Sequence, residues 1–414
     1  MIGSSYKATL LSGQVSQKQE LIFTIFVSML CATVYLASDV FLPSLPEMTH
    51  YFHTSASIAQ ITLTIFMIGL ASSQIMHGLL SDRFGRKTIL KITIPFFLIA
   101  TIGCIYAPNI ETLIVFRFIQ AIAASSCLVI GRSLFTDLFE AKRAQRAFAV
   151  LVPLVSLSPA LAPTIGGILA TYFSWQSAFI FILIFGIFIS GFVFFFLPES
   201  KPVEKRTSSI HLSIIFKSLG EMLSNLNFLK YTVALSFGTL AWWIYVAGAP
   251  LMFHRMHLST AIIGMLYFPA VLPYIATGFI SRHLLKTKSV DEMVKKGMTF
   301  IFLAVFILPI FSILGILNVW TIMIGMALIT ASNGLFLGAT MSAGIAQFSK
   351  NSGLASGLLG TIQLLAGAFA SFLISIFSKN FDSNYFSWMT FILTMIGVFL
   401  FVILSIAVRK LETV

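Results

Sequence analysis

Hydrophobic residues in this chain are gathered in long continuous runs that are separated by short polar connections. Each run is about 20 residues long, the length that an α-helix needs to cross roughly 30 Å of hydrocarbon. A membrane β-barrel does not fit, because its strands alternate apolar and polar residues over about 10 positions. The pattern predicts an all-α integral membrane protein with twelve transmembrane helices, at 21–42, 57–78, 90–107, 111–134, 145–172, 177–197, 228–251, 261–281, 296–315, 319–345, 353–378 and 386–408.

The connections alternate in charge. Lys and Arg gather at 83–91, 142–146, 201–217 and 282–296, and they are absent or rare in the intervening connections. Because basic connections stay on the cytoplasmic side, we expect a multi-pass protein of the bacterial inner (plasma) membrane with both termini in the cytoplasm. The first run, 21–42, is longer than a signal-peptide core and lacks a small-residue cleavage site, so we expect it to be retained.

Composition supports this placement. The chain is 58% hydrophobic and 10% charged, whereas soluble domains carry roughly 25% charged residues. The net charge of +12 comes from the basic connections, which argues against nucleic acid as a partner and for contact with membrane lipid. The cysteines lie within apolar runs and show neither a disulfide framework nor metal-ligand spacing. We therefore expect no cofactor and no metal.

The chain divides into two halves of six spans. The stretch 199–226 is charged and Ser-rich and then becomes amphipathic, and it separates an N-terminal bundle at 1–198 from a C-terminal bundle at 227–414. Two interpretations of this linker stay open: a helix on the membrane surface, or a loosely ordered connection. The segment 78–83 is echoed by 278–283 at the equivalent place in the second half. Parallel repeats of six spans characterise one class of membrane transporters.

The connection after the second span carries the most specific motif, 78-GLLSDRFGRKTIL-90. Gly78 would let two helix ends approach closely, and Gly85 would permit a turn with positive φ. Asp82 suits the positive N-terminus of a neighbouring helix, and Arg86 suits a carboxylate, for which Asp137 is the candidate. The motif resembles the signature loop of the major facilitator superfamily, with these residues in register: Gly78, Leu80, Asp82, Arg83, Gly85, Arg86 and Lys87. The resemblance implies a latch between the two halves; the alternative is a basic cluster that sets topology only.

Further segments resemble drug/proton antiporters of the bicyclomycin-resistance type within that superfamily. The stretch 114-IVFRFIQA-121 places an Arg inside a span, and span 1 ends with 35-YLASDVFLPSLP-46. The stretch 153-PLVSLSPALAPTIGG-167 resembles the Pro/Gly-rich antiporter motif, although Ser158 and Ala162 replace two of its glycines. Small residues let helices pack closely in a membrane. The residues that match this motif are Pro159, Pro163, Gly166 and Gly167.

Asp39 is the one acidic residue of fourteen that we place inside a span, and an ionisable group there indicates function. Lipid disfavours a charged carboxylate and a nearby cation favours it, so the two together permit proton exchange near neutral pH. Arg117 is the cation expected near Asp39, because the two residues lie at a similar depth in the membrane. The resemblance implies that Arg117 controls protonation of this acid. The alternative is that Asp39 caps the helix break before Pro43, while Arg117 satisfies carbonyl groups. Arg132 is expected to extend to the lipid headgroups.

The expected function is proton-coupled efflux of small organic compounds or drugs, by a monomer whose partners are a small-molecule substrate and protons. The alternatives are a dedicated exporter of one metabolite, such as a siderophore, or an uptake carrier. An enzyme is not expected, because the sequence has no paired intramembrane acids, metal-ligand cluster or phosphate-binding Gly-rich loop. Aromatic, Met and amide side chains inside the spans are the candidates for lining a substrate cavity. For each of them, helix packing or lipid contact is the alternative role. The candidates are Tyr35, Met67, Gln120, Trp242, Tyr245, Tyr267, Asn333 and Gln363.

Overall fold

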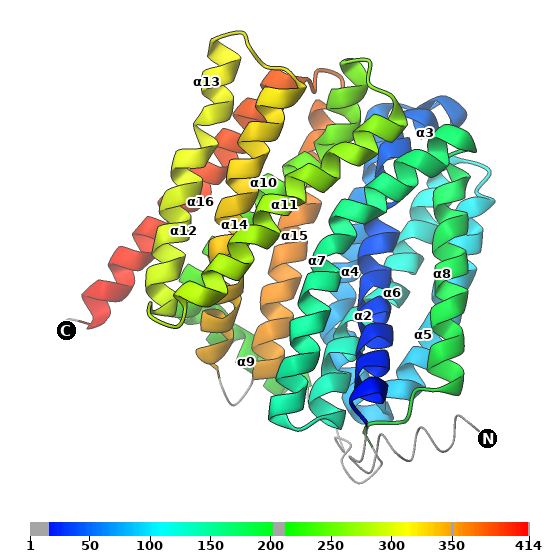
Figure 1. Cartoon of the computed structure of the whole chain (residues 1–414), viewed down its shortest axis with the longest axis vertical. Helices are drawn as coiled ribbons and strands as arrows, with labels where there is room; N and C mark the ends of the chain where they lie inside the picture. The colour runs from blue at the N-terminus through cyan, green and yellow to red at the C-terminus, as the bar shows by residue number, and fades with distance from the viewer. Residues whose placement is uncertain (1–15, 202–211, 349–351, 413–414) are drawn as a thin grey trace.

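The computed structural model describes residues 16–201, 212–348 and 352–412, whose regular structure is entirely helical (Figure 1). The first half contains α2 (Gln17–Asp39), η1 (Leu42–Ser44), α3 (Leu45–Tyr51), α4 (Ala56–Phe84), α5 (Arg86–Ile105), α6 (Ile110–Leu138), α7 (Ala141–Tyr172) and α8 (Gln176–Phe195). The second half contains α9 (Leu212–Ser224), α10 (Leu226–Arg255), α11 (Thr260–Leu284), α12 (Val290–Val305), α13 (Ile307–Ile313), α14 (Val319–Ala346), α15 (Ser352–Phe377) and α16 (Ser383–Glu412).

The described residues contain 11 segments that are long and apolar enough to cross a membrane, with α2 to α3 and α12 to α13 each forming one segment. Helix α7 is not among them, but it has 32 residues, and a helix rises about 1.5 Å per residue, so it also exceeds the hydrocarbon thickness. It packs against α2 on one side and α11 on the other. The predicted all-α membrane fold with twelve spanning helices is therefore confirmed.

The spanning helices form two bundles of six. In the first bundle α6 packs against α2, α4 and α5, and α8 packs against α5. In the second, α10 packs against α14, α15 and α16, while α14 also packs against α11 and α12. Two pairs of helices join the bundles: α4 with α15, and α7 with α11. The exact limits at 198 and 227 stay a prediction, and residues 1–15 and 413–414 lie outside the described parts.

Prolines explain where the spans are interrupted. Helix α2 ends at Asp39 and is followed by the short η1 and α3, which contain Pro43 and Pro46 near their first residues. The ninth span is broken at Phe306 between α12 and α13. Pro309 follows, and its ring would clash with the carbonyl group four residues earlier in a continuous helix. Several helices extend beyond the predicted spans. The apolar run covers only the part of a helix that lies in the hydrocarbon layer, whereas the helix itself continues into the polar regions.

The amphipathic part of the linker forms α9, which contacts α10 and α15. Met222 on this helix is fully buried, whereas Phe216 is 69% exposed. Residues 212–224 are therefore an ordered helix, and its position on the membrane surface stays a prediction. Residues 202–211 in the middle of the predicted linker lie outside the described residues. In Figure 1 this helix lies at the lower end of the molecule.

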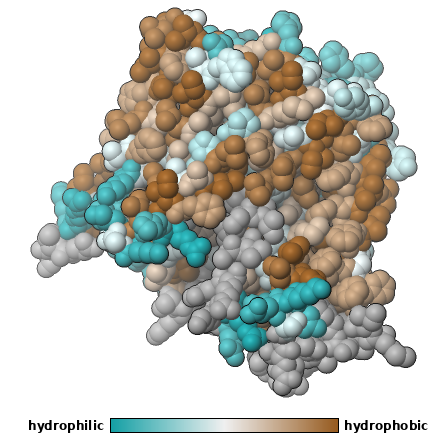
Figure 2. Space-filling view, in the orientation of Figure 1, coloured by the Kyte–Doolittle hydropathy of each residue, from teal (hydrophilic) through white to brown (hydrophobic). Residues whose placement is uncertain are grey.

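The surface separates into an apolar flank and polar ends. In Figure 2 brown residues cover much of the helical flank, and teal residues gather along the lower edge. We call the end of the molecule that carries the 78–90 connection the basic side, and the end that carries α3 and α13 the opposite side. This division matches the alternation of charge between the connections.

Candidate functional site

Asp39 is the last residue of α2 and is 2% exposed. Its carboxylate accepts a hydrogen bond from the hydroxyl group of the neighbouring Ser38. It lines a cavity of about 180 Å³ that is bounded by helices of both bundles. Among the described residues that line this central cavity, Asp39 is the one with a carboxyl group. The helix break after α2 therefore places an acidic group at the junction of the bundles.

Arg117 on α6 is fully buried beside the end of α2. Its guanidinium donates to the carbonyl oxygen of Ala37 at 2.8 Å and to Oε1 of Gln120 at 2.6 Å. It also lies 4.2 Å and 4.0 Å from the ring centroids of Phe41 and Phe66, in the arrangement of a cation–π contact. The other two guanidinium nitrogens have no hydrogen-bond partner among the described residues.

Asp39 and Arg117 thus lie close along α2 without forming a direct ion pair. Both side chains are described, and the guanidinium is not within 4.0 Å of the carboxylate. Arg117 instead holds the carbonyl group two residues before Asp39. This contact corresponds to the alternative in which the arginine satisfies carbonyl groups, and it connects α6 to the turn of helix that carries the acid.

The central cavity has an aromatic wall and amide groups. Besides Tyr35, Trp242, Asn333 and Gln363, which the sequence nominated, it is lined by Trp243. The side-chain oxygen of Asn333 is buried and has no hydrogen-bond partner among the described residues. An apolar pocket with a few polar anchors is the usual construction of a small-molecule site. The remaining lining residues are Asp39, Val155, Pro159, Thr239, Val271, Tyr274, Thr330 and Leu337.

Two more cavities continue from the centre toward the basic side. A cavity of about 100 Å³ shares Tyr35 and Gln363 with the central one and adds Met67 and Arg132. A third, of about 380 Å³, shares Arg132 with the second and reaches Asp82. Arg132, which we expected to extend to the lipid headgroups, lines both of these cavities, and its contact with headgroups stays a prediction.

Three of the nominated cavity residues are not part of these walls. Gln120 is buried, where it binds Arg117 and donates to the hydroxyl group of Thr101 at 2.8 Å. Tyr245 donates to the carbonyl oxygen of Leu266 at 3.2 Å, and Tyr267 donates to that of Val246 at 2.8 Å. The two tyrosines join α10 to α11. Their nomination as cavity residues is wrong, because the sequence does not show which face of a helix meets the cavity.

The Pro/Gly-rich motif of α7 forms one of the contacts between the bundles toward the opposite side. A Cβ atom at Gly167 would lie 2.6 Å from the carbonyl oxygen of Thr260 and 3.2 Å from Cα of Gly264. The hydroxyl group of Thr164 donates to the carbonyl oxygen of Gly264 at 3.0 Å. Gly166 packs directly on the backbone of Val40, next to Asp39. The motif thus closes α7 onto α11 and onto the end of α2, since only glycine leaves room for backbone at these distances.

Pro163 belongs to the same contact, since its carbonyl group faces Gly264, where a Cβ atom would lie 3.1 Å from the carbonyl carbon. Pro159 lies one turn earlier and lines the central cavity. A helix tolerates proline in a membrane when neighbouring helices satisfy the freed backbone groups. The motif therefore contributes both to the closure and to the cavity wall.

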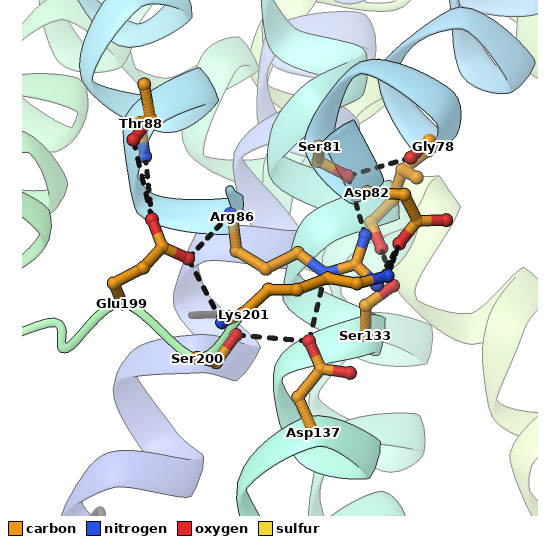
Figure 3. Close-up of polar contacts among 11 residues, drawn as sticks. Gly78, Ser81, Asp82, Arg86, Thr88, Ser133, Asp137, Glu199, Ser200 and Lys201 are labelled. Atoms are coloured by element: carbon orange, nitrogen blue, oxygen red, sulfur yellow. Dashed lines mark hydrogen bonds and ion pairs between the residues drawn. The ribbon is translucent and has the colours of Figure 1, made fainter. Parts of the chain in front are cut away.

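On the basic side, the 78–90 connection forms a dense ionic cluster around Arg86 (Figure 3). Arg86 is 7% exposed. Its guanidinium lies 2.8 Å from Asp82 and 2.9 Å from Asp137, and it donates to the hydroxyl group of Ser81 at 2.6 Å. Lys201 also reaches Asp82, at 2.5 Å. The contact expected between Arg86 and Asp137 is present.

Glu199, which the sequence did not single out, occupies the N-terminus of α5. Its carboxylate accepts hydrogen bonds from the backbone N–H groups of Arg86 at 2.8 Å and Thr88 at 3.3 Å (Figure 3). A carboxylate there is favoured by the unsatisfied N–H groups and the helix dipole. Asp82 instead lines the third cavity together with Gly353 and Leu354 at the start of α15, and its predicted role at the N-terminus of a neighbouring helix stays a prediction. The available signal for Glu199 was its position directly after the sixth span.

The other residues of the motif have separate roles. Gly85 has φ of 101°, as predicted for the turn between α4 and α5. A Cβ atom at Gly78 would meet Val129 at an ordinary 3.8 Å, so the predicted close approach of helix ends there is wrong. Lys87 donates to the carbonyl groups of Phe194 in the last turn of α8 and of Leu197 just after it. Arg83 is exposed and stacks on the neighbouring Phe84.

The cluster ties helices of one bundle together. The hydrogen-bond and ion-pair partners described for Asp82, Arg86 and Glu199 all belong to the first bundle or to the segment directly after it. The second bundle faces the cluster across the third cavity, where α15 contributes Gly353 and Gly357. In this conformation, none of these described contacts of the cluster crosses between the bundles.

Comparisons with known proteins agree with this architecture. The sequence profile of the Major Facilitator Superfamily matches residues 21–371. An uncharacterized MFS-type transporter of Bacillus subtilis is 30% identical over 372 residues, which cover 87% of this chain and 90% of the relative. A bicyclomycin resistance protein homolog of Haemophilus influenzae is 23% identical, over 87% of this chain and 90% of the relative.

Among solved structures, a D-xylose-proton symporter covers 92% of this chain, with 97% of its own length matched, at a TM-score of 0.72 and 15% identity. At that identity the likeness is one of fold. The profile spans most of the chain, and the two bundles of six helices enclose a central cavity between them. This chain is therefore a member of the Major Facilitator Superfamily of membrane transporters.

Proposed function

We propose that this transporter exports small organic compounds in exchange for protons, and that Asp39 is the group that takes up and releases the proton. The observation that carries the proposal is the placement of Asp39: a buried carboxylate on the wall of the cavity between the two bundles. A membrane carboxylate that faces an internal cavity is typical of proton relays. The name of the Haemophilus influenzae relative, a bicyclomycin resistance protein homolog, supports drug export.

The basic side is proposed to face the cytoplasm of a bacterium, with both termini there and the chain in the inner membrane. The enrichment of Lys and Arg in the connections on that side supports this orientation. The cavities then lead from the cytoplasm to Asp39, while the contacts of α7 with α11 and of α4 with α15 close the opposite side. A compound that enters by this route meets the carboxylate before the opposite side opens, as export requires.

The contact between α7 and the end of α2 offers a physical link between protonation and closure. Gly166 packs on the backbone of Val40, one residue after Asp39, while Gly167 packs on α11. Arg117 holds the carbonyl group of Ala37 on the other side of the acid. A change of charge at Asp39 therefore acts on the turn of helix where α2, α6 and α7 meet, next to the contact that must separate for export.

The cavity suits small, largely apolar substrates. Its aromatic wall and the unpaired oxygen of Asn333 offer stacking surfaces and one hydrogen-bond acceptor. Its volume of about 180 Å³ is below the 300–1,000 Å³ that is common for drug-sized ligands. A larger compound therefore requires the bundles to move apart, whereas a small metabolite fits without that movement. This small volume keeps the dedicated exporter of one metabolite as the second candidate.

The test is a substrate screen in a bacterial host that lacks its own drug exporters. The wild-type chain should lower accumulation of at least one compound, and a protonophore should abolish the effect. Asp39→Asn should remove this transport and the accompanying proton release from inverted vesicles, with unchanged protein abundance. Glu47→Gln is the control, because this acid lies in α3 toward the opposite side. Undiminished pH-dependent flux in Asp39→Asn would refute the role of the carboxylate.

A further inference from the structure

Lys230 on α10 is a buried lysine that the transport route does not use. It is 5% exposed and lines a cavity of about 350 Å³ on the basic side of the second bundle. This cavity shares no lining residue with the three cavities of the transport route. It lies where α10, α12 and α16 end on that side. The lining residues are Asn227, Lys230, Tyr231, Asp291, Lys295, Gln347, Ser405, Val408 and Arg409.

The described charges at Asp291 on the wall of this cavity do not balance. Lys230 and Lys295 both contact the carboxylate of Asp291, at 2.9 Å and 2.7 Å, and Tyr231 donates to it at 3.2 Å. Arg409 also lines the wall. The two ammonium groups of Lys230 and Lys295 share the one carboxylate of Asp291, so this part of the wall has an excess of positive charge that attracts an anion.

The wall also offers groups that would bind the oxygens of an anion. The hydroxyl group of Ser405 is buried and has no hydrogen-bond partner among the described residues. Asn227 lies in the first turn of α10, whose N-terminus adds positive potential. Ammonium, guanidinium and hydroxyl groups, all of which line this cavity, are the donors that phosphate oxygens prefer. The cavity is therefore suited to a phosphate group.

The surface beside the cavity indicates what carries that phosphate. On α16, Phe399, Val402 and Ile406 are 65%, 46% and 51% exposed. Their spacing of three and four residues places them along one side of the helix, next to the side that carries Ser405 and Arg409. An apolar stripe that leads away from a basic cavity offers a path for acyl chains.

We propose that this cavity binds the headgroup of an anionic phospholipid from the membrane leaflet on the basic side, with its acyl chains along α16. Basic cavities between membrane helices on the cytoplasmic side are suited to such headgroups. The lipid would complete the charge balance around Asp291 and join α10, α12 and α16. The site is separate from the transport route and does not depend on the proposed export function.

The test uses the purified full-length transporter in detergent, with native mass spectrometry of lipid-bound species. Dioleoylphosphatidylglycerol is compared with dioleoylphosphatidylcholine, which has the same acyl chains but no net charge. The wild type should retain the anionic lipid preferentially. Lys295→Gln and Arg409→Gln should each weaken this retention about fivefold, the effect expected for one basic residue at a membrane surface.

The chain offers a matched control for the loss of charge. Lys296 follows Lys295 on α12, is 56% exposed at its side chain and pairs with Glu292 at 3.0 Å, but does not line the cavity. Lys296→Gln should therefore retain the lipid as the wild type does. Melting temperatures measured without added lipid establish whether each variant is folded.

Three outcomes would overturn the proposal. Equal retention of both lipids by the wild type would exclude recognition of the anionic headgroup. Equal losses in Lys296→Gln and in the two cavity variants would indicate a general effect of surface charge. Displacement of the lipid by millimolar inorganic phosphate would assign the cavity to a soluble phosphate compound instead.

Discussion

The contact between Gly167 and α11 is expected to control how easily the opposite side opens. Gly167→Ala adds a methyl group 2.6 Å from the carbonyl oxygen of Thr260 and 3.2 Å from Cα of Gly264. Both atoms belong to the backbone of a helix in the other bundle, so they cannot rotate away as a side chain could. Overpacking of this kind typically costs about 1–3 kcal/mol.

The cost applies only while α7 and α11 are in contact. The substitution should therefore shift the equilibrium between closed and open conformations about 5-fold to 150-fold toward opening, since about 1.4 kcal/mol corresponds to a factor of ten. Gly191→Ala is the matched control, because a Cβ atom at Gly191 has nothing within 4 Å. That variant should leave the equilibrium unchanged.

Electron paramagnetic resonance distances between two spin labels would report the shift. Tyr172 at the end of α7 and Ile262 near the start of α11 are 77% and 45% exposed, so labelled cysteines there would not disturb the contact. The cysteines of the wild-type chain are buried. Gly167→Ala should increase the population with the longer distance. An unchanged distance distribution would refute the inference that this contact limits opening.

Two further predictions concern the ionic cluster and its turn. Arg86→Gln should lower the free energy of unfolding by about 3 kcal/mol, because it leaves carboxylates of a largely buried cluster without their partner. Arg83→Gln is the control and should have little effect, because it removes an exposed arginine. Equal melting temperatures for the two variants would contradict this assignment. Gly85→Ala should cost about 1–3 kcal/mol, because alanine is strained at φ of 101°. Gly220→Ala on α9, where a Cβ atom has nothing within 4 Å, is the control, and a stable Gly85→Ala would exclude the strain.

Much of the fold could be predicted from local information. Each apolar run forms its own backbone hydrogen bonds when it becomes a helix, so the run alone identifies the span. Gly85 was predictable because positive φ is a property of a single residue. The partner of Arg86 was also predictable, since the inner end of the fourth span offered Asp137 as a carboxylate.

The candidate site was less predictable. Tyr35 and Tyr245 are both aromatic residues inside spans, but one lines the central cavity and the other joins α10 to α11. The difference lies in which side of each helix faces the partner bundle. Glu199 was missed as the acid at the start of α5, because it comes from a segment more than a hundred residues away in the chain.

The sequence by itself determined the spanning helices, the charge difference between the two sides, and the acid at position 39, because these depend on the affinity of each segment for lipid or water. Only the tertiary structure decided that Arg117 binds the carbonyl group of Ala37, that Gly167 meets α11, and that Lys230 borders a separate basic cavity. Those contacts depend on the rotation and crossing of packed helices. In a largely apolar chain, many rotations bury similar surface, and packing of particular side chains selects among them.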